Sequence, residues 1–318
     1  MTASANRKQR AREQREERER QATRAERRKR LHTIGAGGLL AAVAIGALLA
    51  TTLAGGDGDE RIGGGGGGGV TGGGHIHGLG VNPADGSLYI ATHGGLFRSA
   101  EGSSQAPRVG SSDRDLMGFS VVGRDRFVAS GHPGSEPGLP PNIGLTESRD
   151  GGETWEPVSL TGEADFHVLR ASGSRIYGYD GVNGRLMVST NTGREWTERQ
   201  VPSPLVDLAI DPRDADRVTA TTESGLVQSR DAGRSWRKLS DQVALLAWPA
   251  GDRLVMLDGA GRVSVSADGG RTTQPQGAVQ GQAVSFMASP DSLYVALSDG
   301  SVLESSDDGA SFTVRAKV

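Results

Sequence analysis

The sequence predicts an all-β fold, a six-bladed β-propeller of four-stranded blades, preceded by a single transmembrane helix and a Gly-rich linker. Two observations predict the propeller. The stretch SRDGGETW at 148–155 occurs five times in similar form, and the first serines of the copies lie 41, 40, 37 and 39 residues apart. A period of this length is typical of stacked or radial units. Between the copies, short runs rich in valine, threonine and leucine alternate with turn residues, which is the pattern of strands in a meander.

The clearest repeat unit spans residues 206–239 and reads VDLAIDPRDADRVTATTESGLVQSRDAGRSWRKL. The segments DPRDAD, ESG and DAGRS divide it into four expected strands. Six such units begin near positions 75, 115, 165, 204, 243 and 283. Four-stranded sheets at this repeat length predict propeller blades, because blades bury their faces against neighbours and the closed ring protects the sheet edges. The available length, about 244 residues, favours six blades over seven or eight.

The residues before the repeats fall into three segments of different composition. Residues 1–32 hold twelve basic and five acidic side chains and form a basic tail with a charge of about +7. Residues 33–54 carry no charge over 22 positions, which is long enough for a membrane-crossing helix of about 20 residues. Residues 55–74 are rich in glycine and predict a flexible linker. The propeller is expected at 75–318.

The basic run directly before the apolar segment predicts a single-pass protein of the cell membrane, with a cytoplasmic N-terminus and an extracytoplasmic propeller. A cleaved signal peptide is the alternative, because Thr52 and Ala54 form a small-x-small pattern. The long basic region and the long apolar segment favour an uncleaved anchor, and both readings export the propeller.

Charge and cysteine content restrict the partners and the chemistry. The whole chain has a formal net charge of −3, so the part after the basic tail carries about −10. This charge and the expected export argue against nucleic acid as a partner. The chain contains no cysteine, so disulfides are excluded and the propeller depends on its own core.

The repeated turn has a structural explanation. It lies between the third and fourth expected strands, where serine and aspartate side chains can bond turn backbone and glycine accepts a positive φ angle. The terminal tryptophan or phenylalanine is expected to be buried as a wedge between sheets. The predicted structural residues are Ser148, Asp150, Gly152 and Trp155; Ser189, Gly193 and Trp196; Ser229, Asp231, Gly233 and Trp236; Asp268 and Gly270; and Asp307, Gly309 and Phe312.

The pattern S-x-D-x-G-x-x-W resembles the Asp-box, or bacterial neuraminidase repeat, of the sialidase-type propeller superfamily. Asn191 and Thr273 depart from the pattern, and SAEGSSQ at 99–105 is at most a decayed copy. The stretches HIHGLGVNPADGSLYIATHGGLFRS, ASGHPG and GEADFHVL further resemble exported actinobacterial Asp-box proteins labelled as glycosyl hydrolases. This resemblance implies a propeller and a glycosyl hydrolase-like activity, with the boxes in a structural role.

True sialidase activity is not expected. The resemblance to sialidases implies a clamp arginine in an F/Y-R-I-P motif and a tyrosine nucleophile. Here Phe97 and Arg98 are followed by Ser99 and Ala100, and the chain has only four tyrosines.

A candidate ligand site follows from the expected topology. In a meander, the loops between second and third strands and the crossings between blades emerge on one face, opposite the repeated turns. Five of the six histidines lie there, all on the first three blades, whereas His32 lies in the basic tail. The two-residue period of strands places neighbouring polar residues on one side. The candidate ligand-binding residues are His75, His77, His93, His132, His167 and Tyr179, with Asp115 and Asp165 beside them.

Three hypotheses remain open for this rim. A hydrolase would use Asp115 and Asp165 as a catalytic carboxylate pair on a carbohydrate. A metal-binding protein would hold zinc or copper with at least three of the five histidines, and Asp115 or Asp165 would be a fourth ligand or would support a ligand. A non-catalytic binding or assembly module, similar to Asp-box photosystem assembly factors, would bind a protein ligand. The segment SGHPGSEPGLPPN at 130–142 predicts the longest loop over this face, and long loops over a rigid scaffold often bind ligands.

Overall fold

The computed structural model of the chain describes residues 75–318. The predicted tail, membrane segment and linker (1–32, 33–54 and 55–74) lie outside the described residues. Within 75–318, the structure contains no helix with the length and apolarity needed to cross a bilayer.

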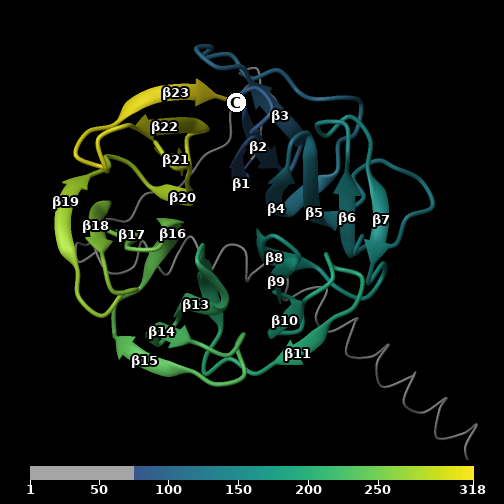
Figure 1. Cartoon of the computed structure of the whole chain (residues 1–318). Coiled ribbons are helices and arrows are strands. Elements are labelled where there is room, and N and C mark those ends of the chain that lie inside the picture. Colours follow the sequence, from purple (N-terminus) through teal and green to yellow (C-terminus); the bar gives the residue numbers. More distant parts are fainter. Residues whose placement is uncertain (1–74) are drawn as a thin grey trace, which may run out of the picture. The chain divides into compact units, whose positions relative to one another are not determined.

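The described part is a ring of six antiparallel sheets (Figure 1). The first strand of each sheet lies toward the centre of the ring and the last strand lies at its circumference. The strands are β1 (Ile76–Val81), β2 (Leu88–Thr92), β3 (Gly95–Ser99), β4 (Asp115–Gly123), β5 (Arg126–His132), β6 (Leu145–Ser148), β7 (Glu156–Ser159), β8 (Phe166–Ser172), β9 (Arg175–Asp180), β10 (Arg185–Ser189), β11 (Thr197–Arg199), β12 (Leu205–Asp211), β13 (Asp214–Thr222), β14 (Gly225–Ser229), β15 (Arg237–Ser240), β16 (Ala244–Ala250), β17 (Arg253–Asp258), β18 (Arg262–Ser266), β19 (Gln274–Ala278), β20 (Ala283–Ala288), β21 (Leu293–Leu297), β22 (Ser301–Ser305) and β23 (Thr313–Lys317).

The predicted six-bladed architecture is confirmed. The first strands of the six sheets begin at positions 76, 115, 166, 205, 244 and 283, each within one residue of the expected start. Blades 2 to 6 have four strands in sequence order, whereas blade 1 has only β1, β2 and β3. An isolated bridge between Phe97 and Arg108 stands where the fourth strand of blade 1 would pair.

The core lies between the blades. Six hydrophobic clusters of buried residues occur in residues 75–318, and each contains side chains from two neighbouring blades. The second strands are buried over most of their length because neighbouring blades cover both of their faces; β2, for example, is buried at all five positions. This explains why β2 (LYIAT) and β21 (LYVAL) are mostly apolar instead of alternating.

The ring closes without a strand shared between its ends. β1 is the innermost strand of blade 1 and β23 is the outermost strand of blade 6. The seam between them is held by a hydrophobic cluster that includes Ile76 and Tyr294. Arg315 donates a hydrogen bond from Nη1 to Ser99 Oγ at 2.8 Å and one from Nη2 to the Ala100 carbonyl at 2.9 Å. Side-chain contacts and one isolated backbone bridge, between Gln105 and Lys317 of β23, therefore replace a shared blade.

The five repeated turns have one hydrogen-bond pattern. In the first, Ser148 Oγ donates to Asp150 Oδ1 at 2.8 Å, the Gly152 amide donates to Ser148 Oγ at 2.8 Å, and the Thr154 amide donates to Asp150 Oδ1 at 3.0 Å. Asn191 keeps the pattern because its side-chain oxygen accepts from Ser189 Oγ and from the Glu195 amide. The serine and the Asp or Asn thus cap the backbone of each turn.

The glycine of each turn also packs against the preceding blade. Gly193 has a φ of 82°, and a Cβ at this position would lie 2.1 Å from Leu145 Cδ2 in β6. The other four turn glycines similarly approach Leu96, Leu186, Leu226 and Val263, all in the third strand of the blade before. The turn therefore contributes to packing between blades as well as to reversing the chain.

The turn tryptophans are less buried than the sequence predicts. Trp155, Trp196 and Trp236 are only half-buried and pack at the edges of the inter-blade clusters. An indole N–H needs an acceptor: Trp236 Nε1 donates to the Gln200 carbonyl at 2.9 Å, and Trp196 Nε1 donates to the Gly193 carbonyl at 2.9 Å. Because Trp236 is only half-buried, truncating it should cost less than the about 3–5 kcal/mol of a fully buried tryptophan.

Acid should weaken these turns. Hydrogen bonds from the Ser235 hydroxyl and amide lower the pKa of Asp231 from 3.8 to about 2. Because the folded-state pKa is depressed, this stabilisation is present above pH 3.8 and is lost as the pH falls toward 2. We expect Asp231→Asn, which copies Asn191, to make the free energy of unfolding depend less on pH between 4 and 2. Chemical denaturation at several pH values measures this, and identical slopes for the variant and the wild type would contradict it.

Candidate metal centre

The rim opposite the repeated turns is built from irregular inner strands. The pairing of β1, β4, β8 and β12 with their second strands shifts register at equivalent places, which gives each inner strand a β-bulge. Bulges re-aim side chains and often lie beside functional sites. The residues at these bulges are His77, Met117, His167 and Val206.

A first group of side chains joins blades 1 and 2. His77 lies in β1, His93 directly follows β2, and Asp115 begins β4. His93 Nδ1 is 2.8 Å and His77 Nε2 is 3.8 Å from Asp115 Oδ1. One ligand atom from each residue lies within 4.8 Å of the other two, a spacing that could hold one metal ion. The His77 and His93 rings meet edge to face, with centroids 4.3 Å apart.

A second group joins blades 2 and 3. His132 ends β5, Asp165 directly precedes β8, and His167 is the bulge residue of β8. Asp165 Oδ2 is 2.8 Å from His167 Nε2 and 3.6 Å from His132 Nε2. Asp165 is only 1 % exposed, so a buried carboxylate again lies against two imidazoles.

The charges of the first group favour metal ligation. Burial, and after it the charge of His93, lowers the pKa of His77 to about 4. His77 is therefore neutral at physiological pH and can offer a nitrogen lone pair. The contact with the Asp115 carboxylate raises the pKa of His93. Burial is the largest influence on Asp115 and disfavours its ionised form, but the hydrogen bond to His93 and the charges of His93, His77 and His132 together lower the pKa of this carboxyl.

The two groups influence one another. Burial is the largest influence on His167 and acts to lower its pKa, but the hydrogen bond to Asp165 and the charges of Asp165, Asp180 and Asp115 together raise the pKa above its usual value. The charge of His132 in turn acts on Asp115. One electrostatically coupled cluster, to which we refer as the His/Asp rim, thus contains four histidines and two aspartates: His77, His93, His132, His167, Asp115 and Asp165.

The remaining predicted residues differ in their distance from this cluster. His75 is exposed and its ring lies edge-on to His93, with centroids 5.6 Å apart. Tyr179 lies apart, because its ring is buried in the hydrophobic cluster between blades 3 and 4. In a second strand such as β9, neighbouring blades cover both faces, so only residues at the strand end or in the following loop reach the rim.

Three buried polar atoms of the rim have no hydrogen-bond partner among the described residues: His77 Nε2, Asp115 Oδ1 and Asp165 Oδ1. Of these, Asp115 Oδ1 has His93 Nδ1 as an ion-pair partner at 2.8 Å. Leaving a buried acceptor or donor unpaired costs about 1–3 kcal/mol, so such atoms are typical of sites that bind a ligand. Imidazole and carboxylate are the donors that zinc and copper use in proteins.

The long loop after β5 is fixed at two points. His132 Nδ1 is 2.9 Å from the Pro141 carbonyl oxygen. Glu136 accepts hydrogen bonds from Arg114 Nε at 2.9 Å and Arg114 Nη2 at 2.8 Å, and it accepts a third from Ser112 Oγ at 2.8 Å. The loop at 130–142, which the sequence predicts to be the longest over this face, is therefore attached both to the His/Asp rim and to the connection between blades 1 and 2.

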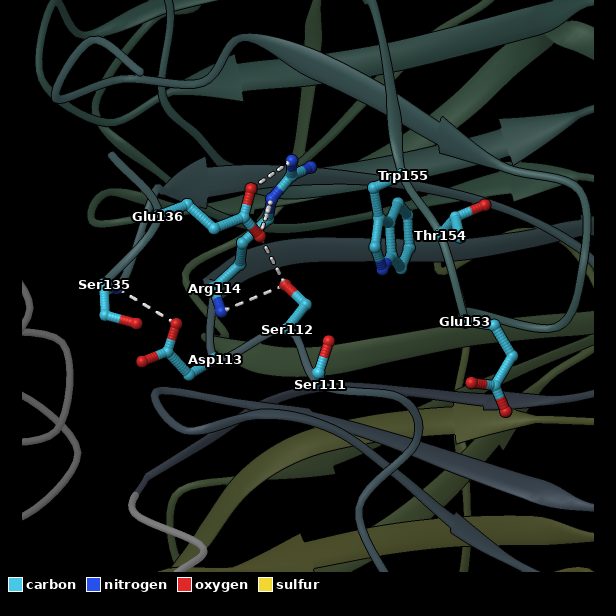
Figure 2. A pocket seen from close by; sticks show the side chains of 9 residues that line it. All are labelled: Ser111, Ser112, Asp113, Arg114, Ser135, Glu136, Glu153, Thr154 and Trp155. Atoms are coloured by element: carbon cyan, nitrogen blue, oxygen red, sulfur yellow. Dashed lines mark hydrogen bonds and ion pairs between the residues drawn. The ribbon is translucent and has the colours of Figure 1, made fainter. Parts of the chain in front are cut away.

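A polar pocket of about 250 Å³ lies beside this loop. Figure 2 shows the indole of Trp155 facing the space next to Ser112 and the Arg114–Glu136 ion pair. Glu153 and Asp113 also line the pocket. The sequence reasoning did not find this pocket, because it assigned Trp155 only a structural role. A signal was available in the polar run SSDRD at 111–115, which directly precedes the inner strand of blade 2.

Comparison with known proteins identifies the fold but no family. No protein-family model matches the sequence, and no curated protein matches it. Among solved structures, a nidogen/laminin complex matches with a TM-score of 0.55 and 14% identity over 71% of this chain and 91% of that chain. The GH74 xyloglucanase from Xanthomonas campestris matches with a TM-score of 0.52 and 17% identity over 76% of this chain and 45% of that enzyme. An ancestral GH74 enzyme matches with a TM-score of 0.51 and 14% identity, over 77% of this chain and 38% of the enzyme.

This chain thus spans less than half of either GH74 enzyme. At these identities the similarity shows a propeller fold and not a shared activity.

Proposed function

We propose that the chain is a metal-binding propeller that holds zinc or copper on the His/Asp rim, with His77, His93 and Asp115 as ligands. The observation that carries the proposal is the convergence of one donor atom from each residue within 4.8 Å. Two imidazoles and one carboxylate are an established ligand set for zinc. Three protein ligands leave a further coordination position for water or for a group from a partner.

The state of His77 supports this proposal. A buried imidazole with a pKa of about 4 needs no deprotonation before it binds a cation. Metal affinity depends on such deprotonated ligands. The unpartnered Nε2 of His77 gains a bond when an ion is bound, which offsets part of the cost of its burial.

The same cluster weakens the hydrolase alternative. A glycosidase needs two carboxyl groups on opposite sides of a sugar, one as acid and one as base or nucleophile. Asp115 and Asp165 instead each contact two imidazoles, an arrangement that supports ligation more than proton transfer to a sugar.

Export and membrane attachment belong to the proposal. They are supported by the uncharged segment 33–54 and the basic residues before it. Membership of the Asp-box superfamily is supported by the shared hydrogen bonds of the five turns. Protease digestion of intact cells tests the orientation, since only an external propeller would be cleaved.

Metal binding is tested with the full-length chain in detergent after removal of metals by a chelator. Titration calorimetry with Zn²⁺ and Cu²⁺, followed by elemental analysis, should find at least one bound ion per chain. We expect His93→Ala to weaken binding by at least about 100-fold, at the upper limit of the 10- to 100-fold losses seen when a supporting residue of a metal site is removed. His93 is 43 % exposed, so its loss should spare the fold.

His32→Ala is the matched control. His32 is the one histidine outside the propeller sequence, so this variant should bind the metal as the wild type does. A wild-type chain that binds no Zn²⁺ or Cu²⁺, or a His93→Ala variant with unchanged affinity, would contradict the proposed function.

A second candidate function is carbohydrate binding in the pocket of Figure 2, and the side chains that line it favour this. Sugars stack their apolar faces on indole rings and use their hydroxyls to bond carboxylates and serines. Trp155, Ser112 and Glu153 supply these groups in one pocket. A change in tryptophan fluorescence on addition of xyloglucan oligosaccharides, lost in Trp155→Ala and kept in Trp196→Ala, would support it.

A further inference from the structure

We propose that the thioether of Met117 is a further ligand of the ion on the His/Asp rim, and that this ion is copper, bound as Cu(I). The inference rests on the proposed function, because it accepts His77 and His93 as ligands of the same ion. It extends that function in two respects: it selects copper over zinc, and it adds a sulfur ligand.

The first argument is the position of Met117 in its strand. Met117 is the bulge residue of β4 and occupies the place that His77 has in β1 and His167 has in β8. It follows the proposed ligand Asp115 by two residues. The charge of His167 contributes to the lowered pKa of His77, although the strand of Met117 lies between theirs. The bulge residues of three successive blades are therefore close neighbours.

The second argument is the close approach of the three inner strands at these bulges. Glycine follows the bulge residue in both β1 and β4. A Cβ on Gly78 would lie 2.8 Å from Phe119 Cβ, and a Cβ on Gly118 would lie 2.4 Å from the Phe166 carbonyl oxygen. The two glycines thus let β4 pack tightly between β1 and β8, which brings Met117 toward the imidazoles of the rim.

The third argument is the packing of the side chain. Three of the four described methionines pack into hydrophobic clusters between blades: Met187, Met256 and Met287. Met117 is 7 % exposed but belongs to none of the six clusters found in residues 75–318. In the described part, Ile143 is the other buried hydrophobic residue outside these clusters, and it has no donor atom. A thioether that is buried beside the rim and contributes to no apolar cluster is available as a metal ligand.

A thioether distinguishes between the two metals that the rim could bind. Soft sulfur donors such as methionine select Cu(I), whereas zinc sites use thiolate, imidazole and carboxylate. Met117 adds a soft donor to the imidazoles of His77 and His93, and the site then favours Cu(I). Zinc gains little from a thioether, so the loss of Met117 should affect the two metals differently.

The test compares Cu(I) with Zn²⁺ in the full-length chain in detergent. Competition with a Cu(I) chelator under reducing conditions measures the affinity for Cu(I), and titration calorimetry measures the affinity for Zn²⁺. We expect Met117→Leu to weaken Cu(I) binding by at least about 10-fold, the lower limit of the losses seen when a supporting residue of a metal site is removed. Zn²⁺ binding should be unchanged in this variant.

Met187→Leu is the matched control. Met187 is also 7 % exposed, but it packs in the cluster between blades 2 and 3, so its exchange should leave the affinities for both ions unchanged. Exchange of methionine for leucine nearly conserves volume, and cores tolerate it. Both variants should therefore fold, and thermal unfolding of the metal-free chains verifies this.

X-ray absorption at the copper edge supplies a direct readout of the sulfur. The chain contains no cysteine, so a sulfur atom next to copper must belong to a methionine. The wild type and Met187→Leu should show this sulfur, and Met117→Leu should show only nitrogen and oxygen around the ion.

The outcomes separate the inference from the proposed function. A wild type that binds Zn²⁺ but not Cu(I), copper without a sulfur neighbour, or a sulfur signal that persists in Met117→Leu would overturn the role of Met117. Equal losses of Cu(I) and Zn²⁺ binding in Met117→Leu would also overturn it. In each case the proposed function stands, provided that His93→Ala still weakens metal binding. A wild-type chain that binds neither ion would overturn both.

Discussion

Asp207→Ala is expected to destabilise the propeller by about 3–5 kcal/mol, the usual cost of removing one partner from a buried ion pair. Asp207 lies in β12 and is 2 % exposed. Its Oδ1 accepts hydrogen bonds from Arg170 Nη2 in β8 and from the Leu208 amide, both at 2.8 Å. Its Oδ2 accepts from the Leu246 amide in β16 at 2.8 Å. One carboxylate therefore joins the inner strands of three successive blades, and alanine would leave three donors unpaired.

Asp216→Ala is the matched control for this prediction. Asp216 pairs with Arg175 across the same junction between blades 3 and 4, but its side chain is 44 % exposed. Exposed ion pairs contribute about 0–1 kcal/mol. Chemical denaturation of both variants gives the comparison. Equal losses of stability would show that Asp207 is not the inter-blade connection that its hydrogen bonds indicate.

Gly131→Ala is expected to weaken both stability and metal binding. Gly131 lies in β5 with a φ of 145°, and a Cβ there would lie 1.9 Å from the Asp115 carbonyl oxygen and 2.9 Å from the Met117 amide nitrogen. These are backbone atoms of β4, so only a movement of the strand relieves the clash. A left-handed φ costs about 1–2 kcal/mol and overpacking adds about 1–3 kcal/mol, so we expect a loss of about 2–5 kcal/mol.

The expected effect on metal binding has the same cause. The strand that must move begins with Asp115, so a ligand of the proposed ion is displaced. Gly173→Ala is the control, because Gly173 has a φ of 57° and a Cβ there meets nothing within 4 Å. Calorimetric titration with Zn²⁺ and chemical denaturation should find both properties impaired in Gly131→Ala. In Gly173→Ala, only the smaller strain cost should remain, and a similar effect of the two variants would contradict the prediction.

The fold could be predicted closely from the sequence because its signals are local. The turn residues and apolar runs repeat with the blade period, and each blade starts within one residue of the expected place. Blade 1 could not be predicted fully. The segment after Ser99 lacks a repeated turn, and its only regular pairing with β3 is the Phe97–Arg108 bridge. Whether such a weak segment forms a strand depends on contacts across the seam, such as those of Arg315 with Ser99, which no local pattern reveals.

The candidate site, like the fold, could be predicted only in part from the sequence. The strand order of a meander is enough to place the five histidines on one face, because strand order determines where the loops emerge. It does not predict which imidazole contacts which carboxylate. The pairs His93–Asp115 and His132–Asp165 cross from one blade to the next, so they depend on blade orientation and on the bulges. The turn aspartates could be placed by pattern, whereas the Arg114–Glu136 pair depends on how a long loop folds back.

The seam between the first and last blades differs from the other five blade junctions in the loss of chain entropy that its formation requires. At those junctions, the inner strands of neighbouring blades begin about 40 residues apart, whereas β1 and β20 meet across the seam after some 200 residues of chain. Closing a loop about five times longer costs roughly 1.4 kcal/mol more by the logarithmic rule for loop closure. The seam is therefore where thermal opening should begin. A circular permutant that joins the two ends and opens the chain between blades 3 and 4 would transfer this weak point to a new junction.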